Sequence, residues 1–243
     1  MHLVSVIMPY FKKRNYVEKS IRSVINQTYK MFELIIIYDD EDKSDLNFIK
    51  EIIGNNEKVK LVINENNIGA GNSRNQGIKL SNGEFIAFID SDDYWNENKL
   101  ARQVDYINKN NFDFVFCNYE KIINDKKKII LSKKSLNYND LLKSCDIGLS
   151  TVILKKNVIN KISFPNLKTK EDYVFWLDLT KKNIIAHNQG DVLVSWNKVK
   201  NSLSSSVIQK IKDGFIVYYK YQNFNFFKSL YFLGRLSLNS LKK

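Results

Sequence analysis

The segment Asp90-Ser91-Asp92 places two carboxylates two positions apart, directly after the apolar run 84–89. Carboxylates with this spacing can converge on one divalent cation, and Mg²⁺ binds in proteins through one or two carboxylates together with phosphate oxygens. The alternative is a polar loop in which Asp90 or Asp93 caps the helix that follows. The position after a predicted strand favours the cation site.

A second acidic pair, Asp39-Asp40, follows the apolar run Leu34–Tyr38. A carboxylate here could accept hydrogen bonds from the imide of a nucleobase or from a ribose hydroxyl, or it could cap a turn. Paired acids after a buried strand also occur in phospho-acceptor receiver domains. Those domains require a lysine after a later strand, and the sequence offers no convincing one.

Arg74 belongs to the glycine-flanked segment Asn67–Asn75, in a chain whose basic residues are mostly lysine. A guanidinium holds phosphate oxygens through two parallel hydrogen bonds, whereas a lysine offers a point charge. The alternative is an ordinary arginine on a helix surface. The segment is not a P-loop, because it lacks the sequence Gly-Lys-Ser/Thr.

Glu171 and Asp172 precede the apolar segment Tyr173–Leu177. Carboxylates at the start of a helix are stabilised by the helix dipole, which accounts for the pair without any function. One of them could instead act as a general base toward a hydroxyl group.

Alternating strands and helices position these groups. The apolar runs 3–8, 34–38, 59–63 and 84–89 predict strands, and helical periodicity follows over 16–27, over 71–80 and after residue 93. This pattern favours a doubly wound α/β sheet, in which ligands bind at the carboxyl ends of the strands. Pro9-Tyr10, Asp39-Asp40 and Asp90-Ser91-Asp92 all follow strands, so we expect them to form one site.

The second half of the chain is less regular. Strands are predicted over 112–118, 151–154 and 192–196, and Glu171-Asp172 opens a helix. Lys126-Lys127-Lys128, followed by an apolar triplet, predicts a hairpin with a basic turn.

The composition excludes several classes of protein. Two cysteines and two histidines among 243 residues exclude a disulfide-built secreted fold, a cysteine-rich zinc site and a histidine-rich metal site. The net charge of +12 attracts anions, whether nucleic acid, acidic lipid or a phosphate-bearing substrate. Because no helix-turn-helix, zinc or RNP-like signature accompanies the charge, we expect no nucleic-acid partner.

The first hundred residues resemble the family 2 glycosyltransferases. Their motifs occur in the family's order and spacing at Val4–Phe11, Ser23–Tyr29, Leu34–Asp40, Asn67–Ile78 and Gly83–Asp93, and the segment Glu171–Leu177 resembles the family's Glu-Asp motif. The resemblance implies a GT-A fold: a Rossmann-like, mainly parallel sheet flanked by helices. It also implies a nucleotide-diphosphate sugar donor, most simply a UDP-sugar, and a cofactor of Mn²⁺ or Mg²⁺.

By the same resemblance, the nucleoside pocket is lined by Pro9, Tyr10, Asp39 and Asp40, and Arg74 lies near the pyrophosphate. The family's Asp-X-Asp motif corresponds to Asp90-Ser91-Asp92, with Asp92 as a direct metal ligand beside Asp90. Asp172, with Glu171 beside it, corresponds to the catalytic base.

Two segments depart from the family pattern. Asp39-Asp40 is followed by Glu41-Asp42-Lys43-Ser44 where the family usually has Gly-Ser. Trp196-Asn197-Lys198 stands where Tyr-Arg is common, so Lys198 could replace that arginine as a pyrophosphate contact.

We divide the chain into a glycosyltransferase domain, 1–206, and a helical tail, 207–243. Within the domain, 1–93 forms the nucleotide-sugar-binding half and 94–206 the acceptor-side half. The tail carries seven lysines and arginines against the single acid Asp213, together with nine aromatic residues. Basic, aromatic amphipathic helices suit an anionic membrane surface. The alternative is that the aromatic side chains pack on the domain.

The sequence thus predicts an inverting, metal-dependent glycosyltransferase that transfers a hexose to a glycan or lipid-linked acceptor in cell-surface polysaccharide synthesis. The alternative is a catalytically silent nucleotide-sugar-binding or scaffold protein of the same fold. We find no signal peptide and no apolar run of the roughly 20 residues that a spanning helix needs. We therefore expect a cytoplasmic protein, or one that is peripheral on the inner face of the cytoplasmic membrane.

Overall fold

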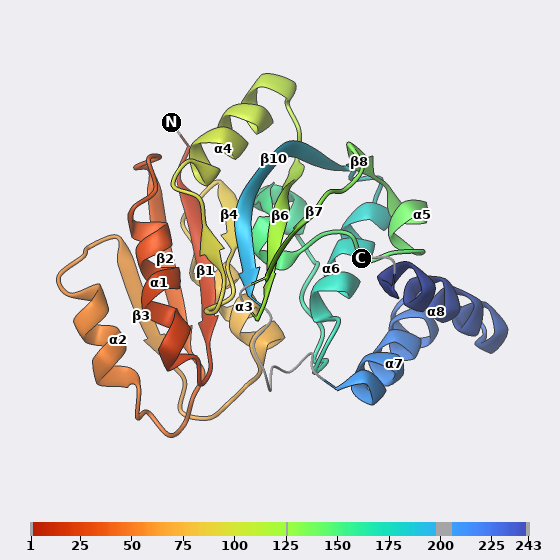
Figure 1. Cartoon of the computed structure of the whole chain (residues 1–243), viewed down its shortest axis with the longest axis horizontal. Coiled ribbons are helices and arrows are strands. Elements are labelled where there is room, and N and C mark those ends of the chain that lie inside the picture. The colour runs from red at the N-terminus through yellow and green to blue at the C-terminus, as the bar shows by residue number, and fades with distance from the viewer. Residues whose placement is uncertain (1, 125, 198–205, 242–243) are drawn as a thin grey trace.

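A computed structural model describes residues 2–124, 126–197 and 206–241 of the chain. One sheet runs through the molecule, with strands in the order β3-β2-β1-β4-β9-β6-β10-β5, while β7 pairs with β6 and β8 with β10 (Figure 1). The strands are β1 (Val4–Tyr10), β2 (Phe32–Tyr38), β3 (Val59–Ile63), β4 (Phe85–Phe88), β5 (Tyr94–Trp95), β6 (Phe114–Ile123), β7 (Lys126–Ile130), β8 (Ser135–Leu136), β9 (Ile153–Lys155) and β10 (Ala186–Asn197).

Helices cover both faces of this sheet. They are α1 (Arg14–Ile25), α2 (Leu46–Ile53), α3 (Ala70–Leu80), α4 (Lys99–Asn110), α5 (Tyr138–Leu141), α6 (Glu171–Lys181), α7 (Val207–Ile216) and α8 (Phe226–Leu241). Short 3₁₀ turns occupy Leu149–Thr151 and Lys156–Ile159, and a π-helical turn, Val217–Tyr221, follows α7.

The residue pattern of the strands explains this layering. β1 is buried along its whole length, as expected for a parallel strand covered on both faces. Its Val4, Val6 and Met8 pack in the core beneath α1, α2 and α4, whereas Ile7 packs in the core beneath α3 and α6. β3, β2, β1 and β4 are parallel, so their carboxyl ends meet at one edge.

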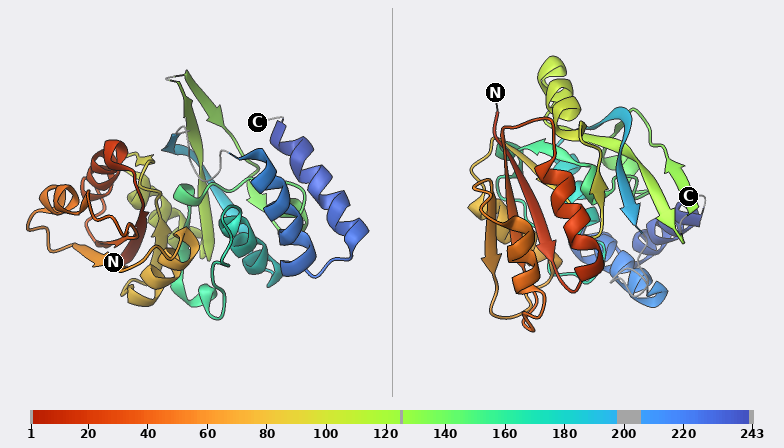
Figure 2. Two further views of the ribbon diagram at one scale, coloured as in Figure 1. Left: turned by 90° about the horizontal axis from the view of Figure 1, so that it is seen from below. Right: turned by 60° about the vertical axis from the view of Figure 1, so that its left-hand side comes forward.

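The predicted fold class is confirmed: a mainly parallel sheet flanked by helices, with amphipathic helices at the C-terminal side. α7 and α8 lie side by side at the opposite end of the molecule from α2 (Figures 1 and 2). In the part of the chain that the structure describes, no helix combines the length and the apolar character needed to cross a membrane.

The predicted hairpin and the predicted strand over 192–196 are both present, but the place of the turn and the start of the strand were wrong. Lys126, Lys127 and Lys128 lie within strand β7 and do not form a turn. β10 begins at Ala186, six residues before the predicted strand, because a bulge absorbs the polar segment Asn188–Asp191. Gly190 has a φ of 102° in this bulge, and its carbonyl accepts a hydrogen bond of 2.6 Å from the Asn118 side chain.

Candidate active site

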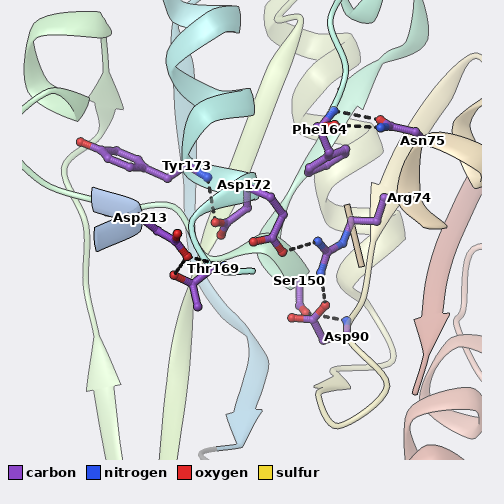
Figure 3. Close-up of polar contacts among 10 residues, drawn as sticks. Arg74, Asn75, Asp90, Ser150, Phe164, Thr169, Asp172, Tyr173 and Asp213 are labelled. Atoms are coloured by element: carbon purple, nitrogen blue, oxygen red, sulfur yellow. Dashed lines mark hydrogen bonds and ion pairs between the residues drawn. The ribbon is translucent and has the colours of Figure 1, made fainter. Parts of the chain in front are cut away.

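Arg74, from α3, joins two segments that lie far apart in the sequence (Figure 3). Its Nη1 donates to Glu171 Oε1 at 2.7 Å, and its Nη2 donates to Asp90 Oδ1 at 2.8 Å. The residue is only 4% exposed. Burial alone would lower the pKa of the guanidinium, but the two carboxylates outweigh it and raise that pKa. The Asp-X-Asp and Glu-Asp motifs are therefore one ionic cluster.

Gly71 makes the approach of α3 to this cluster possible. A Cβ at this position would lie 2.8 Å from the Pro165 carbonyl oxygen and 3.5 Å from Glu171 Cγ. Any larger residue would push α3 away from the segment that precedes α6 and lengthen the Arg74 contacts. The glycine three residues before the arginine thus has a packing role.

Hydrogen bonds from two other elements, the 3₁₀ turn Leu149–Thr151 and β10, hold the Asp90–Asp93 loop. The Ser150 hydroxyl donates to Asp93 Oδ2 at 2.5 Å and accepts from the Asp90 N–H at 3.0 Å. The Asn197 side chain donates to the Asp92 carbonyl at 2.6 Å, and its N–H donates to Asp93. Burial, and then the charges of Asp90 and Asp92, raise the pKa of Asp93 well above its ordinary value. Asp93 therefore serves to shape the loop.

Asp92 forms an ion pair with a residue that the sequence analysis did not single out. Lys13 Nζ, from the loop between β1 and α1, lies 2.7 Å from Asp92 Oδ2. Burial and the neighbouring Asp90 raise the pKa of Asp92, while the ammonium group lowers it. Because β1 and β4 are adjacent and parallel, the loops that follow them meet at the same edge.

Asp90 and Asp92 suit a hard divalent cation by chemistry, since both offer carboxylate oxygens. Their side chains keep exposed fractions of 32% and 14%, so both reach the solvent-accessible edge. Across the described ranges, no cluster of three or more His, Cys, Asp or Glu residues could hold a metal alone. Two carboxylates plus phosphate oxygens of a bound substrate are the arrangement that Mg²⁺ favours.

The two carboxylates after β2 have different surroundings. Asp39 accepts hydrogen bonds from the Asn64 side chain and the backbone N–H groups of Ile68 and Gly69, at 2.8 to 2.9 Å. It therefore ties the end of β2 to the start of α3. Asp40 is 1% exposed, and within the described residues its buried Oδ2 has no hydrogen-bond partner. Asp40 is thus the carboxylate of the pair that keeps a buried oxygen unsatisfied within the described residues.

Pro9 and Tyr10 close β1 beside the end of β2, opposite Ile37 and Tyr38. The Tyr10 ring stacks on the Tyr38 ring, and its hydroxyl donates to Asp45 at 2.5 Å. Burial and this bond to Asp45 raise the pKa of Tyr10. Tyr10 is fully buried, so its ring and its hydroxyl are both engaged within the protein.

Asp172 lies in the first turn of α6, and its Oδ1 accepts the N–H of Tyr173 at 2.7 Å. Burial raises the pKa of this carboxyl, and the charges of Lys170 and Arg74 oppose the rise. No hydrogen bond from a described residue occupies its second oxygen. A partly buried carboxylate with one unoccupied oxygen can accept a proton from a hydroxyl.

The structure thus brings Arg74, Asp90, Glu171 and Asp172 into one cluster, and Asp40 lies at the same edge beside the end of β1. Ser91 is buried next to them, with its carbonyl accepting from the Ser20 hydroxyl. Sequence reasoning missed Lys13, Ser150 and Asn197, although Asn197 adjoins the Trp196 that was noted. Lys198, the expected pyrophosphate contact, lies outside the described residues.

The family model for "Glycosyl transferase family 2" matches residues 5–164 of this chain. The chain belongs to glycosyltransferase family 2. The Escherichia coli family member WfgD, a UDP-Glc:alpha-D-GlcNAc-diphosphoundecaprenol beta-1,3-glucosyltransferase, is 39% identical over 87% of this chain and 83% of its own. The putative teichuronic acid biosynthesis glycosyltransferase TuaG of Bacillus subtilis is 31% identical over 99% of this chain and 97% of its own.

Solved structures agree with this family 2 assignment at the level of the fold. Residues 1–349 of Staphylococcus aureus TarS, in complex with UDP-GlcNAc, superpose with a TM-score of 0.73 at 21% identity, over 95% of this chain and 70% of that one. The mannosyltransferase PcManGT of Pyrobaculum calidifontis, in complex with GDP-Man and Mn²⁺, gives 0.69 at 15% identity, over 92% and 65%. The fold of this family 2 glycosyltransferase is therefore GT-A.

Proposed function

We propose that this family 2 enzyme transfers a hexose from a UDP-sugar to a hydroxyl of a lipid-linked glycan, with inversion at the anomeric carbon. The observation that carries the proposal is the ion pairing of Arg74 with both Asp90 and Glu171. It sets the expected donor-binding motif beside the expected base. The activity of WfgD, with its UDP-glucose donor and diphosphoundecaprenol acceptor, supports these substrate classes.

In this proposal the donor nucleoside lies at the ends of β1 and β2. Asp40, whose buried Oδ2 is unpaired among the described residues, accepts a hydrogen bond from the base imide or the ribose. Pro9 and Tyr10, which are both buried, close β1 at this edge of the sheet and support the pocket from within the protein. Asp39 fixes the wall behind them through its contacts to the start of α3.

The residues that would hold a divalent cation are Asp92 and Asp90, with phosphate oxygens of the donor completing its ligands. When bound, Mn²⁺ or Mg²⁺ would neutralise the charge that develops on the leaving diphosphate. Because the leaving diphosphate needs no acid to protonate it, the protein needs only one carboxylate for proton transfer. Arg74 would keep the Asp90 carboxylate in place while the cation is bound.

Asp172 is the proposed general base. It would take the proton of the acceptor hydroxyl while that oxygen attacks the anomeric carbon from the face opposite the diphosphate. Glu171 is a positioning residue in this scheme, because its carboxylate is bound to Arg74. Its salt bridge sets the start of α6 relative to the Asp90–Asp93 loop.

Measuring nucleotide release tests this function. The enzyme is incubated with Mn²⁺ and with UDP-, GDP-, CDP- or dTDP-sugars, with and without a diphosphoprenol-linked sugar acceptor. We expect UDP release that depends on the acceptor, and we expect Asp172→Asn to bind UDP normally but to lose transfer. An active Asp172→Asn would contradict the base assignment. Donor binding without hydrolysis or transfer by the unmutated chain would favour the silent scaffold protein.

We further propose that the enzyme acts in the cytoplasm, peripherally on the inner face of the membrane, through the hairpin of α7 and α8. This hairpin both packs on the domain and presents an apolar surface. Val217, Tyr218 and Leu236 are buried against the core beneath α6. A groove of about 460 Å³ remains on the outer side, lined by Ile211, Lys212, Phe215, Ile216, Phe226, Leu230 and Leu233.

Charge supports an anionic lipid surface as the occupant of this face. Phe227 is 81% exposed, and Phe226 and Tyr231 are also more than half exposed. The exposed lysines Lys212, Lys220 and Lys228 share the hairpin with these rings, whereas its one acid, Asp213, is buried. Apolar side chains with cations at their margin are the pattern of helices that lie in a membrane interface.

A further inference from the structure

Lys13 is the charged side chain at the sheet edge that the proposed mechanism leaves without a role. Its ammonium group lies 2.7 Å from Asp92 Oδ2, and the two side chains are 21% and 14% exposed. Asp92 is also the proposed metal ligand. A cation that takes Oδ2 of Asp92 displaces Lys13, and one that takes the other oxygen lies beside the ammonium charge.

The backbone of Lys13 is fixed, so only its side chain can respond. Its carbonyl oxygen accepts the N–H groups of Tyr16 and Val17 at 2.9 and 3.0 Å, which starts α1. Lys13 is one of the residues that line a cavity of about 170 Å³, together with Lys12, Arg14, Asn15, Tyr16 and Asp45. The ammonium group therefore has room to turn away from Asp92 without any change in the fold.

Neighbouring cations are not equally free to exchange. Arg74 donates to two carboxylates and is almost fully buried. Arg14 donates to Asp45 at 2.9 Å. Lys12 is exposed and lies over the Phe11 ring at 5.3 Å. Among these four, Lys13 is paired with Asp92, whereas the other proposed ligand, Asp90, is paired with the buried Arg74.

We propose that Lys13 is an exchangeable counter-ion of Asp92, which couples binding of the divalent cation to binding of the donor diphosphate. Without donor, a cation at Asp92 is opposed by the ammonium charge, whether it displaces that group from Oδ2 or binds the other oxygen beside it. When the diphosphate arrives, its oxygens accept the displaced ammonium group and also complete the cation's ligands. The cation is thereby held firmly only together with the nucleotide, and the inference rests on the proposed function.

Thermodynamic linkage makes the coupling between Mn²⁺ binding and UDP binding measurable. If UDP strengthens Mn²⁺ binding through Lys13, then Mn²⁺ strengthens UDP binding by the same factor, and both gains fall together when Lys13 is neutralised. Lys13→Met removes the charge and keeps the length of the side chain. Lys12→Met makes the same change one residue away in the same cavity wall, and Lys13→Arg restores the charge.

The experiment is calorimetric titration of MnCl₂ into each protein, alone and with saturating UDP. We expect Lys13→Met to bind Mn²⁺ alone about fivefold more tightly than the unmutated enzyme, since a partly exposed ion pair of this kind contributes up to about that factor. With UDP present, Lys13→Met should bind Mn²⁺ no more tightly than the unmutated enzyme, or less tightly. The factor by which UDP strengthens Mn²⁺ binding should therefore be at least fivefold smaller in Lys13→Met. Lys12→Met and Lys13→Arg should behave like the unmutated enzyme.

Equal strengthening by UDP in Lys13→Met and in the unmutated enzyme would overturn the inference, and so would equal effects of Lys12→Met and Lys13→Met. Lys13→Gln serves as a second neutral variant if Lys13→Met fails to fold. Titration of UDP itself separates the two levels of the argument. Absence of UDP binding in every protein would contradict the proposed donor, whereas normal UDP binding with an unchanged response to Mn²⁺ would contradict only the exchange.

Discussion

Thr169 donates both its backbone N–H, at 3.0 Å, and its hydroxyl, at 2.8 Å, to the same oxygen of Asp213 (Figure 3). Asp213 is the buried acid of α7, and Thr169 lies three residues before Asp172. A second link runs between the hydroxyls of Tyr173 and Tyr218, 2.9 Å apart. The helical hairpin is therefore tied to the turn that presents the proposed base.

We expect Thr169→Val to lower kcat several-fold while leaving the KM for the donor nearly unchanged. The substitution keeps the shape and the N–H of residue 169 but removes its hydroxyl bond to a carboxylate, which costs about 1.5–3 kcal/mol. Thr180→Val is the control, because it removes a hydroxyl bond to Trp176 within the same helix, away from the base. Equal loss of kcat in both variants would indicate a general effect on stability.

Arg74→Met should destabilise the enzyme by about 3–5 kcal/mol at neutral pH, since it leaves two partly buried carboxylates without their partner. Burial already raises the pKa of Glu171, and Arg74 opposes that rise, so removing Arg74 raises the pKa further. A carboxyl with a raised pKa in the folded state favours folding when protonated. The deficit in unfolding free energy, measured with urea, should therefore shrink as the pH falls.

The same urea measurements at several pH values could also contradict this role of Arg74. A deficit that stays constant from acidic to neutral pH would show that Arg74 acts by packing, including its contact with the Phe164 ring at 5.5 Å. Arg74→Lys should recover only part of the stability, because an ammonium group cannot span Asp90 and Glu171 in the same fork geometry.

The acidic limb of the profile of kcat/KM against pH should report the ionisation of the Asp172 carboxyl. Its pKa is raised above the ordinary aspartate value by burial, and Lys170 lowers it in part. A general base works when ionised, so kcat/KM should rise with pH through this raised pKa. Lys170→Met should move the limb to higher pH, whereas the exposed Lys168→Met should leave it in place. A limb that stays unchanged in Lys170→Met would argue against Asp172 as the titrating base.

If the hairpin of α7 and α8 docks on a membrane, binding of the protein to vesicles should require both its exposed aromatic rings and anionic lipid. Phe227→Ser should reduce flotation with phosphatidylglycerol vesicles roughly tenfold, because burying a phenylalanine side chain contributes about 1.5–3 kcal/mol. Leu131→Ser is the control, since Leu131 is 70% exposed beyond the β6–β7 hairpin. Equal flotation of all three proteins, or equal binding to uncharged phosphatidylcholine vesicles, would contradict the docking surface.

The local pattern of apolar runs was enough to predict the sheet, the edge where the polar groups gather and the helical C-terminal segment. Side-chain partners were not predictable in the same way. Arg74 and Glu171 are 97 positions apart, and Lys13 and Asp92 meet only because β1 and β4 pair in parallel. The sequence also could not separate Asp39 from Asp40, since the difference depends on which backbone N–H groups the fold brings to each.

In the polar segment of β10, the local sequence favours a structure that the fold does not adopt. Asn188 and Gly190 have the composition of a turn, yet they form a bulge inside a long strand. The Asn188 side chain donates to Asn118 Oδ1 at 2.8 Å, so a polar pair from two neighbouring strands satisfies itself within the sheet. Local propensity is overridden here by a partner 70 positions away.

The strand order has a consequence for how the chain is made. β9 lies between β4 and β6, although it follows both in the sequence. While the protein is being synthesised, the free edges of β4 and β6 stay unpaired until residues 153–155 have left the ribosome. Exposed strand edges are sites of intermolecular pairing. For this enzyme, exposed strand edges therefore persist in two steps: β9 covers β4 and part of one edge of β6, and the other edge of β6 stays open until β10 is made.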